Sequence, residues 1–213
     1  MSDDLRLFGV GTSRTMRAHW ILLELGLDYE SLPIQSRSGE TMTDEFRRLN
    51  PRHKIPVLQH GQFVLSESAA IVQYLSDTFA DPNEFYVPRD ARSRAELNEW
   101  CYFIVTELDA ASLYVVRRHS DLAPIYGAAE TAVGSAKTYF LHNLEAMAPR
   151  IDRAPYLLGD RLSGADILLM TCLDWALVSG IALPKQAVDY RLRIAQRPAY
   201  RAALKRNFAQ SRS

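Results

Sequence analysis

The sequence has few cysteines, no excess of either charge and no apolar run long enough to cross a membrane. Its two cysteines, Cys101 and Cys172, are far apart and form no CxxC pair, which excludes a disulfide framework and a zinc site of ordinary spacing; both thiols are expected to be reduced and buried. The 25 basic and 25 acidic side chains balance, so no electrostatic field would gather nucleic acid or anionic lipid. The five histidines are scattered without ligand spacing, and no metal site is expected.

Two other common signals are missing. The N-terminal MSDDLRLF carries acidic residues where a secretory signal would carry basic ones, which favours a cytoplasmic protein. The stretch GVGTSR begins like a dinucleotide-binding loop, but Arg14 stands where the third glycine of that motif would be. The length and composition are sufficient for one large or two small ordered domains, because 213 residues with 47% hydrophobic side chains can build a packed core.

The chain changes character near residue 80. Over 1–80, short apolar runs that predict strands alternate with helical periodicity, which indicates an α/β domain. The expected elements are strands at 5–10 and 28–34, helices at 13–25, 42–49 and 66–79, and a hairpin that turns at His60-Gly61. Residues 81–90 contain two prolines and are expected to form a linker. Residues 91–213 show only helical periodicity and predict an all-helical domain, with helices at 91–119, 125–147, 163–179 and 187–208.

Three separated stretches narrow the choice of family. They are GTSRTMRAHWILLELGLDYE, SGETMTDEFRRLNPRHKIPVLQHGQFVLSESAAIVQYLSD and YLLGDRLSGADILL. All three resemble the cytosolic glutathione S-transferase family, in the serine-type branch related to the theta and zeta classes and their bacterial relatives. The resemblance implies a thioredoxin-like N-terminal domain, a helical-bundle C-terminal domain, glutathione as co-substrate, a small electrophile as second substrate and a homodimer.

The first stretch places short hydroxyl side chains at the start of a helix. A free thiol has a pKa of about 8.5, and lowering it by about two units requires about 2.7 kcal/mol of preferential stabilisation of the thiolate. A helix N-terminus provides roughly 0.3–1 kcal/mol and a hydroxyl donor about 1.5–3 kcal/mol, so the two together are sufficient. The family motif implies Ser13 as the donor to the glutathione sulfur, with Thr12 as the alternative, while Arg14 adds positive potential or faces water. Capping of the helix alone is a competing interpretation.

The second stretch supplies candidate contacts for the rest of glutathione. X–Pro bonds are cis in only about 5–6% of cases, but the resemblance implies a cis bond between Ile55 and Pro56 and pairing of the Ile55 backbone with the cysteinyl part of glutathione. An ordinary proline at the start of a strand is the alternative. Lys54 is a candidate for the glycine carboxylate, and His53 flanks it; either side chain could instead be merely solvated.

The same stretch ends on a pair that the resemblance assigns to the γ-glutamyl group. Glu67 would accept the ammonium, and the Ser68 hydroxyl with the free amides at the helix start would receive the carboxylate. The alternative is that Ser66 is a simple N-cap and Glu67 a favourable acid in the first helical turn.

The third stretch carries a structural motif. Ser163 stands three residues before Asp166, as in a capping box, and Leu162 and Ile167 occupy the positions of a hydrophobic staple. This motif is expected to start a buried helix.

The leading functional hypothesis is a glutathione transferase that conjugates glutathione to small hydrophobic electrophiles through a hydroxyl-stabilised thiolate. A glutathione-dependent isomerase or dehalogenase of the zeta type is an alternative, although the zeta pattern of paired serines followed by cysteine is replaced here by TSRT. A non-catalytic binding protein that keeps the fold is a second alternative. No cysteine lies near the corner, so a mixed-disulfide mechanism lacks its nucleophile.

Overall fold

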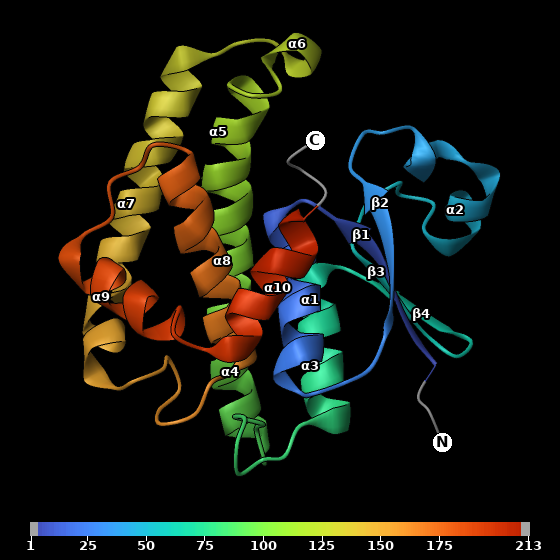
Figure 1. Ribbon diagram of the computed structural model, residues 1–213. Coiled ribbons are helices and arrows are strands. Elements are labelled where there is room, and N and C mark those ends of the chain that lie inside the picture. The colour runs from blue at the N-terminus through green and yellow to red at the C-terminus, as the bar shows by residue number, and fades with distance from the viewer. Residues whose placement is uncertain (1–3, 210–213) are drawn as a thin grey trace. The chain divides into compact units, whose positions relative to one another are not determined.

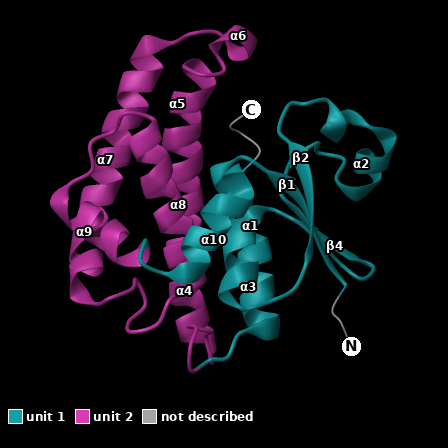
Figure 2. Cartoon of the chain, viewed as in Figure 1, with its two compact units in different colours: residues 1–82, 195–213 teal, residues 83–194 magenta. Residues whose placement is uncertain are grey.

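The first of two compact units is built on a four-stranded sheet. The computed structural model describes residues 4–209, which divide into unit 1, residues 4–82 with 195–209, and unit 2, residues 83–194 (Figure 2). The strands are β1 (Leu5–Val10), β2 (Glu30–Gln35), β3 (Val57–His60) and β4 (Phe63–Ser66), in the order β2-β1-β3-β4. β1 pairs in parallel with β2 and antiparallel with β3, and β3 and β4 form a hairpin. His60 pairs with Phe63, so the hairpin turns at Gly61-Gln62, one residue later than predicted.

Helices cover both faces of this sheet. They are α1 (Ser13–Glu24) and α3 (Ser68–Phe79) on one face, and the short η1 (Glu40–Met42) and α2 (Asp44–Leu49) on the other (Figure 1). Thr43 is the N-cap of α2, and its hydroxyl accepts a hydrogen bond from Phe46 N at 3.2 Å. Phe46 then packs against Phe8 and Val57 of the sheet, which fixes α2 on its face.

The last helix, α10 (Pro198–Phe208), belongs to unit 1. The sequence instead predicted one helix at 187–208 within an all-helical domain over 91–213. The structure has two helices there, and the second packs along α1. The Tyr200 ring meets the buried Trp20 ring edge-on with centroids 5.0 Å apart, and Arg197 forms an ion pair with Glu24. These contacts place α10 in the unit that holds the sheet. The periodicity of the sequence does not predict them.

Unit 2 is entirely helical. Its helices are α4 (Ala91–Phe103), η2 (Ile104–Leu113), α5 (Tyr114–His119), α6 (Ala123–Tyr126), α7 (Glu130–Arg153), α8 (Gly164–Val178) and α9 (Lys185–Ile194). The long helical run predicted at 91–119 is confirmed, but its middle, η2, is a π-helix. The capping box at the start of α8 is also confirmed: the Ser163 hydroxyl accepts from Asp166 N, and Asp166 Oδ2 accepts from Ser163 N at 2.7 Å.

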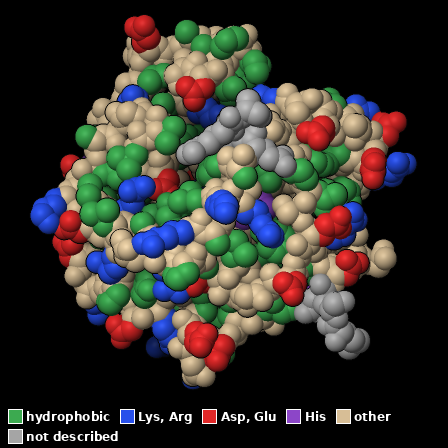
Figure 3. Space-filling view, in the orientation of Figure 1, with side chains coloured by type: hydrophobic (Ala, Val, Ile, Leu, Met, Phe, Trp, Pro, Cys, Tyr) green, Lys and Arg blue, Asp and Glu red, His purple; other side chains and the backbone are tan. Residues whose placement is uncertain are grey.

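Both cysteines are free and buried, as predicted. Acidic and basic side chains are interspersed over the face of the molecule in Figure 3. Within residues 4–209, no helix is both long and apolar enough to pass through a bilayer. The same residues contain no cluster of three or more His, Cys, Asp or Glu side chains arranged to hold a metal ion.

Candidate functional site

The loop between β1 and α1 and the first turn of α1 carry the residues that were predicted to bind the sulfur. Thr12 is the N-cap of α1, and its Oγ1 accepts a hydrogen bond from Thr15 N at 3.0 Å. Thr15 Oγ1 in turn accepts from Thr12 N at 3.0 Å, which completes a capping box. Ser13 follows as the first helical residue, and among residues 4–209 its half-buried hydroxyl has no hydrogen-bond partner. Thr12 is therefore engaged as the cap, whereas the Ser13 hydroxyl is free to donate; Arg14 comes next and is partly exposed.

Gly9 joins this corner to the cis-proline segment. The Ile55–Pro56 peptide bond is cis, as the family resemblance implied. Gly9 has a φ of 121°, and a Cβ built on it would lie 2.6 Å from Ile55 Cβ and 3.0 Å from Thr15 Cγ2. Ile55 and Thr15 thus approach the backbone of β1 at the same residue, because glycine leaves room for both. The first turn of α1 and the segment before Pro56 lie side by side as a result.

His53 and Lys54 precede the cis bond and have different surroundings. His53 has a left-handed backbone with φ 55°, and its Nδ1 donates to Thr41 O at 2.7 Å, since a carbonyl oxygen can only accept. The Lys54 ammonium is exposed and has no partner within the described residues, while Lys54 O accepts from Asn50 Nδ2 at 2.8 Å. Of the two side chains, Lys54 is therefore the one that is available to bind a carboxylate.

The start of α3 holds the two residues predicted for the γ-glutamyl end. The N-cap is Glu67 and not Ser66, so the simple-cap alternative is wrong. Glu67 has a φ of 73°, a conformation that costs free energy for a residue with a side chain and that is concentrated at functional sites. Ser68 is buried, and its Oγ accepts a hydrogen bond from Arg17 Nη1 at 3.2 Å. Because Glu67 makes no side-chain capping bond within the described chain, the first amides of α3 can bind an anionic group.

Sequence patterns alone do not reveal that Arg52 lies at this end of the site. Its Nη1 donates to Glu67 Oε1 at 2.9 Å and its Nη2 donates to Ser66 Oγ. Arg52 and Glu67 are 15 residues apart, and the β3–β4 hairpin, which pairs Val57 with Ser66, brings them together. Both side chains of the ion pair are more than half exposed, so the pair contributes at most about 1 kcal/mol.

Arg17 is a second residue that the patterns miss. It is 1% exposed and extends from α1 to Ser68, so it ties the start of α3 to the helix that carries Ser13. Arg17 is a charged residue inside the stretch of α1 that is buried from Thr15 to Leu22. Buried arginines need partners, and this one indicates a polar contact across the unit.

His19 is a buried titratable side chain on the same helix. Its Nε2 donates to Gly9 O at 3.1 Å, and its Nδ1 accepts from the Tyr29 hydroxyl at 2.7 Å, because the carbonyl oxygen can only accept. Burial lowers the pKa of His19 to about 4; the hydrogen bond to Gly9 opposes this shift and the charge of Arg206 adds to it. The neutral imidazole therefore holds the backbone of Gly9, where the corner and the cis-proline segment meet.

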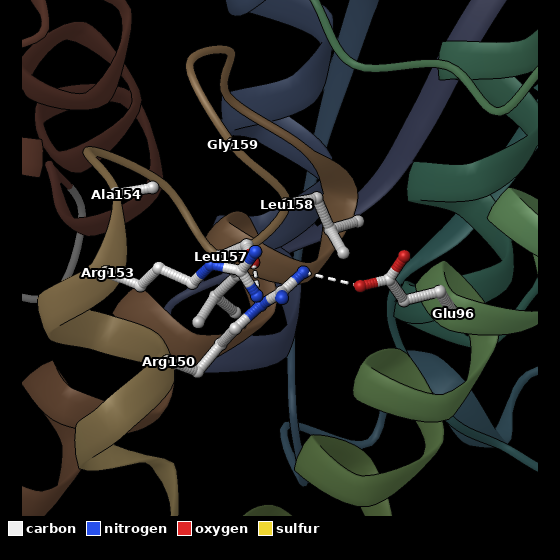
Figure 4. Close-up of a pocket in the computed structure, with 7 residues that line it drawn as sticks. All are labelled: Glu96, Arg150, Arg153, Ala154, Leu157, Leu158 and Gly159. Carbon is white, nitrogen blue, oxygen red and sulfur yellow. Dashed lines mark hydrogen bonds and ion pairs between the residues drawn. The ribbon is translucent and has the colours of Figure 1, made fainter.

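A separate cavity of about 250 Å³ lies in unit 2 (Figure 4). It is lined by Glu96, Arg150, Arg153, Ala154, Leu157, Leu158 and Gly159. Arg150 is committed to structure there, since it donates to Glu96 Oε1 at 2.6 Å and to Leu157 O. None of the residues predicted for glutathione lines this cavity, and its interactions tie α7 to α4 and to the loop before α8.

Two family models match the chain. The model of the glutathione S-transferase N-terminal domain matches residues 3–77, and the model of the glutathione S-transferase C-terminal domain matches residues 103–198. The first match covers every residue of the candidate site described above, and the second covers most of unit 2.

Individual relatives agree with these matches. Glutathione S-transferase F14 of Arabidopsis thaliana is 31% identical over 158 residues, 72% of this chain, but the chain spans only 61% of that relative's length. Glutathione S-transferase GST-4.5 of Xanthomonas campestris pv. campestris is 30% identical over 169 residues, 74% of this chain and 78% of the relative. Among solved structures, the theta class glutathione S-transferase of Xanthomonas axonopodis pv. citri, with glutathione bound, is 25% identical and superposes with a TM-score of 0.81 over 96% of this chain and 97% of that one. From its two domain matches and these relatives, the chain belongs to the glutathione S-transferase family.

Proposed function

We propose that this chain is a serine-type glutathione transferase that conjugates glutathione to small hydrophobic electrophiles. The observation that carries the proposal is the free hydroxyl of Ser13 on the first residue of α1, next to the cap formed by Thr12. The glutathione-bound structure of the Xanthomonas axonopodis relative supports the choice of ligand.

The residues present fit the chemistry of the tripeptide. Glutathione has an ammonium and a carboxylate at one end, a thiol in the middle and a second carboxylate at the other end. Glu67 carries the charge that binds an ammonium, and the uncapped amides of α3 with the Ser68 hydroxyl bind a carboxylate. Lys54 supplies a cation for the second carboxylate, and the backbone of Ile55 supplies strand-like pairing for the middle.

Around the thiol of glutathione, the residues of this chain must stabilise the thiolate more than the neutral thiol. Glutathione supplies the nucleophilic sulfur when bound. The Ser13 hydroxyl donates to that anion, and the free amides at the start of α1 add the positive end of the helix dipole. No acidic residue lies in the first turn of α1, so nothing there opposes the negative charge of the sulfur.

Retention on immobilised glutathione, followed by conjugation to an aromatic halide, tests this proposal. The wild type is expected to be retained and to turn over the halide. Ser13→Ala is expected to be retained but to lose about 10-fold to 100-fold in kcat/KM, because a hydrogen bond to an anion contributes about 1.5–3 kcal/mol. Retention without turnover of a broad panel of electrophiles would favour a binding protein, and an unchanged rate in Ser13→Ala would reassign the donor to Thr12.

Two further properties stay predictions. A homodimer is expected from the family, and light scattering after size-exclusion chromatography tests it. A cytoplasmic location is expected from the family, and fractionation of cells that express the protein tests it.

A further inference from the structure

Asn207 of α10 is hydrogen-bonded to the loop that carries Ser13. Its Nδ2 donates to Thr12 O at 3.0 Å, and its Oδ1 lies 3.2 Å from Gly11 N and 2.7 Å from Thr15 Oγ1, which both can donate to it. Its backbone carbonyl also accepts from Gly11 N at 2.9 Å. Asn207 is 1% exposed and Thr15 is 0% exposed, so these bonds form away from water. One buried side chain thus contacts three residues around the corner.

The partners fix the orientation of the Asn207 amide. Thr12 O can only accept and Gly11 N can only donate, so Nδ2 must face the first and Oδ1 the second. In the opposite orientation Oδ1 would face the acceptor Thr12 O and Nδ2 would face the donor Gly11 N, and neither pair could form a hydrogen bond. Asn207 therefore provides a donor and an acceptor in one arrangement, which neither alanine nor aspartate reproduces.

The contact acts on the peptide group between Thr12 and Ser13. Thr12 O accepts from Asn207 Nδ2 and also from Met16 N at 3.0 Å. Because a trans peptide group is planar, with its C=O and N–H pointing in opposite directions, the Ser13 N–H is directed away from the body of the helix. A hydrogen bond to the carbonyl also polarises the N–H of the same peptide group and makes it a stronger donor.

We propose that Asn207 is a positioning residue for the sulfur-binding corner, which holds the Thr12–Ser13 peptide group and the first turn of α1 in the orientation that stabilises an anion. This proposal rests on the proposed function of Ser13. Asn207 acts through the loop and does not contact the sulfur itself. The C-terminal helix, whose Asn207 lies 195 residues after Thr12, is then a part of the site and not only of the core.

The thiol titration of bound glutathione tests this inference in the full chain. The thiolate absorbs near 240 nm, and its absorbance in the saturated complex is followed against pH for wild type, Asn207→Ala and Asn207→Asp. We expect the thiol pKa to rise by about one unit in Asn207→Ala, which corresponds to about tenfold less thiolate below that pKa. In conjugation assays kcat/KM then falls about fivefold at pH 6.5 and stays within about twofold at pH 9, while the Kd for glutathione changes less than about threefold. Asn207→Asp is expected to shift the titration at least as far, because it removes the amide donor and adds negative charge.

Tyr200→Leu is the matched control. It weakens the packing of the same helix on Trp20 but leaves the hydrogen bonds of Asn207 in place, so it should lower the melting temperature without moving the thiol titration. A titration that moves equally in Tyr200→Leu and Asn207→Ala would overturn the proposal, because α10 would then act only through general stability.

Hydrogen exchange in the absence of glutathione provides a second measurement. Gly11 N and Thr15 N should exchange faster in Asn207→Ala than in Tyr200→Leu, since only the first substitution releases the loop. Equal exchange and an unmoved titration in a folded Asn207→Ala would refute the positioning role and leave the proposed function of Ser13 intact. A wild-type complex whose thiol titrates as it does free in buffer would contradict both.

Discussion

Gly9 and Ile55 are so close that any side chain at residue 9 would collide with residue 55. A Cβ on Gly9 would lie 2.6 Å from Ile55 Cβ, a separation that real Cβ atoms do not adopt, and the φ of 121° at Gly9 also disfavours a side chain. Gly9 therefore marks the place where the strand β1, the corner at Thr15 and the cis-proline segment share one small volume.

Gly9→Ala is expected to damage both stability and ligand binding. The methyl group displaces Ile55 or bends β1, which should cost more than about 2 kcal/mol and weaken glutathione binding, because the Ile55 backbone shifts. Gly26→Ala is the matched control: Gly26 also has a positive φ, 65°, but a Cβ there meets nothing within 4 Å. It should cost about 1 kcal/mol and leave the Kd unchanged. Urea unfolding and calorimetric titration measure the two effects, and equal results for the two variants would contradict this role of Gly9.

Glu67→Gln is expected to weaken glutathione binding about tenfold, because the variant loses the charge that we propose binds the γ-glutamyl ammonium. An analogue of glutathione that lacks the α-amino group isolates this contact. Its Kd should be the same for the wild type and Glu67→Gln. A tenfold difference for the analogue as well would show that Glu67 acts through its strained backbone or through Arg52 instead.

His19 is expected to make the protein less stable in acid. Its pKa of about 4 in the folded chain is below the ordinary value of 6.5, so between these values the unfolded chain binds more protons than the folded one. The contribution of the neutral His19 is therefore fully present above about pH 7. As the pH falls from 6.5 towards 4, the free energy of unfolding decreases by about 3 kcal/mol in total. His19→Gln should be less stable at pH 7 but should lack this part of the pH dependence. The difference between the two urea-unfolding series from pH 4 to 7 measures it, and parallel curves would refute the assignment.

Asp166→Ala is expected to lower stability without abolishing glutathione binding. The buried carboxylate accepts from Leu157 N and Ser163 N, both at 2.7 Å, and from the Tyr190 hydroxyl at 2.5 Å. The substitution leaves these buried donors without an acceptor, which should cost about 3 kcal/mol and lower the melting temperature by roughly 6–12 °C. Thermal melts with and without glutathione measure this effect; an unchanged melting temperature would mean that the network does not stabilise α8.

Local chemistry made some of these features predictable. The Ser163–Asp166 box and the Thr43 cap each involve residues three apart, so the sequence contains the whole motif. The cis bond before Pro56 followed from the family resemblance and not from any local rule. The strands and the three longer helices of residues 4–82, and the helical character of unit 2, could be predicted from the periodicity of apolar residues.

What could not be predicted depends on contacts between distant segments. Asn207 reaches Thr12 across 195 residues, and Arg52 reaches Glu67 only because β3 and β4 form a hairpin. The spacing of apolar residues in α10 is helical, as in the helices of unit 2, so it does not show which unit the helix joins. The packing of α10 on α1 is seen only in the folded chain. The π-helix at Ile104–Leu113 likewise could not be distinguished from an α-helix by its periodicity.

The most direct measurement is the thiol titration of glutathione in the saturated complex, with Ser13→Ala beside the wild type. The wild-type complex should show the thiolate absorbance appearing at a pH about two units below that of free glutathione, and Ser13→Ala should bring the midpoint back towards the free value by about one to two units. A wild-type midpoint equal to that of glutathione in buffer would contradict the stabilisation of the sulfur anion at the start of α1.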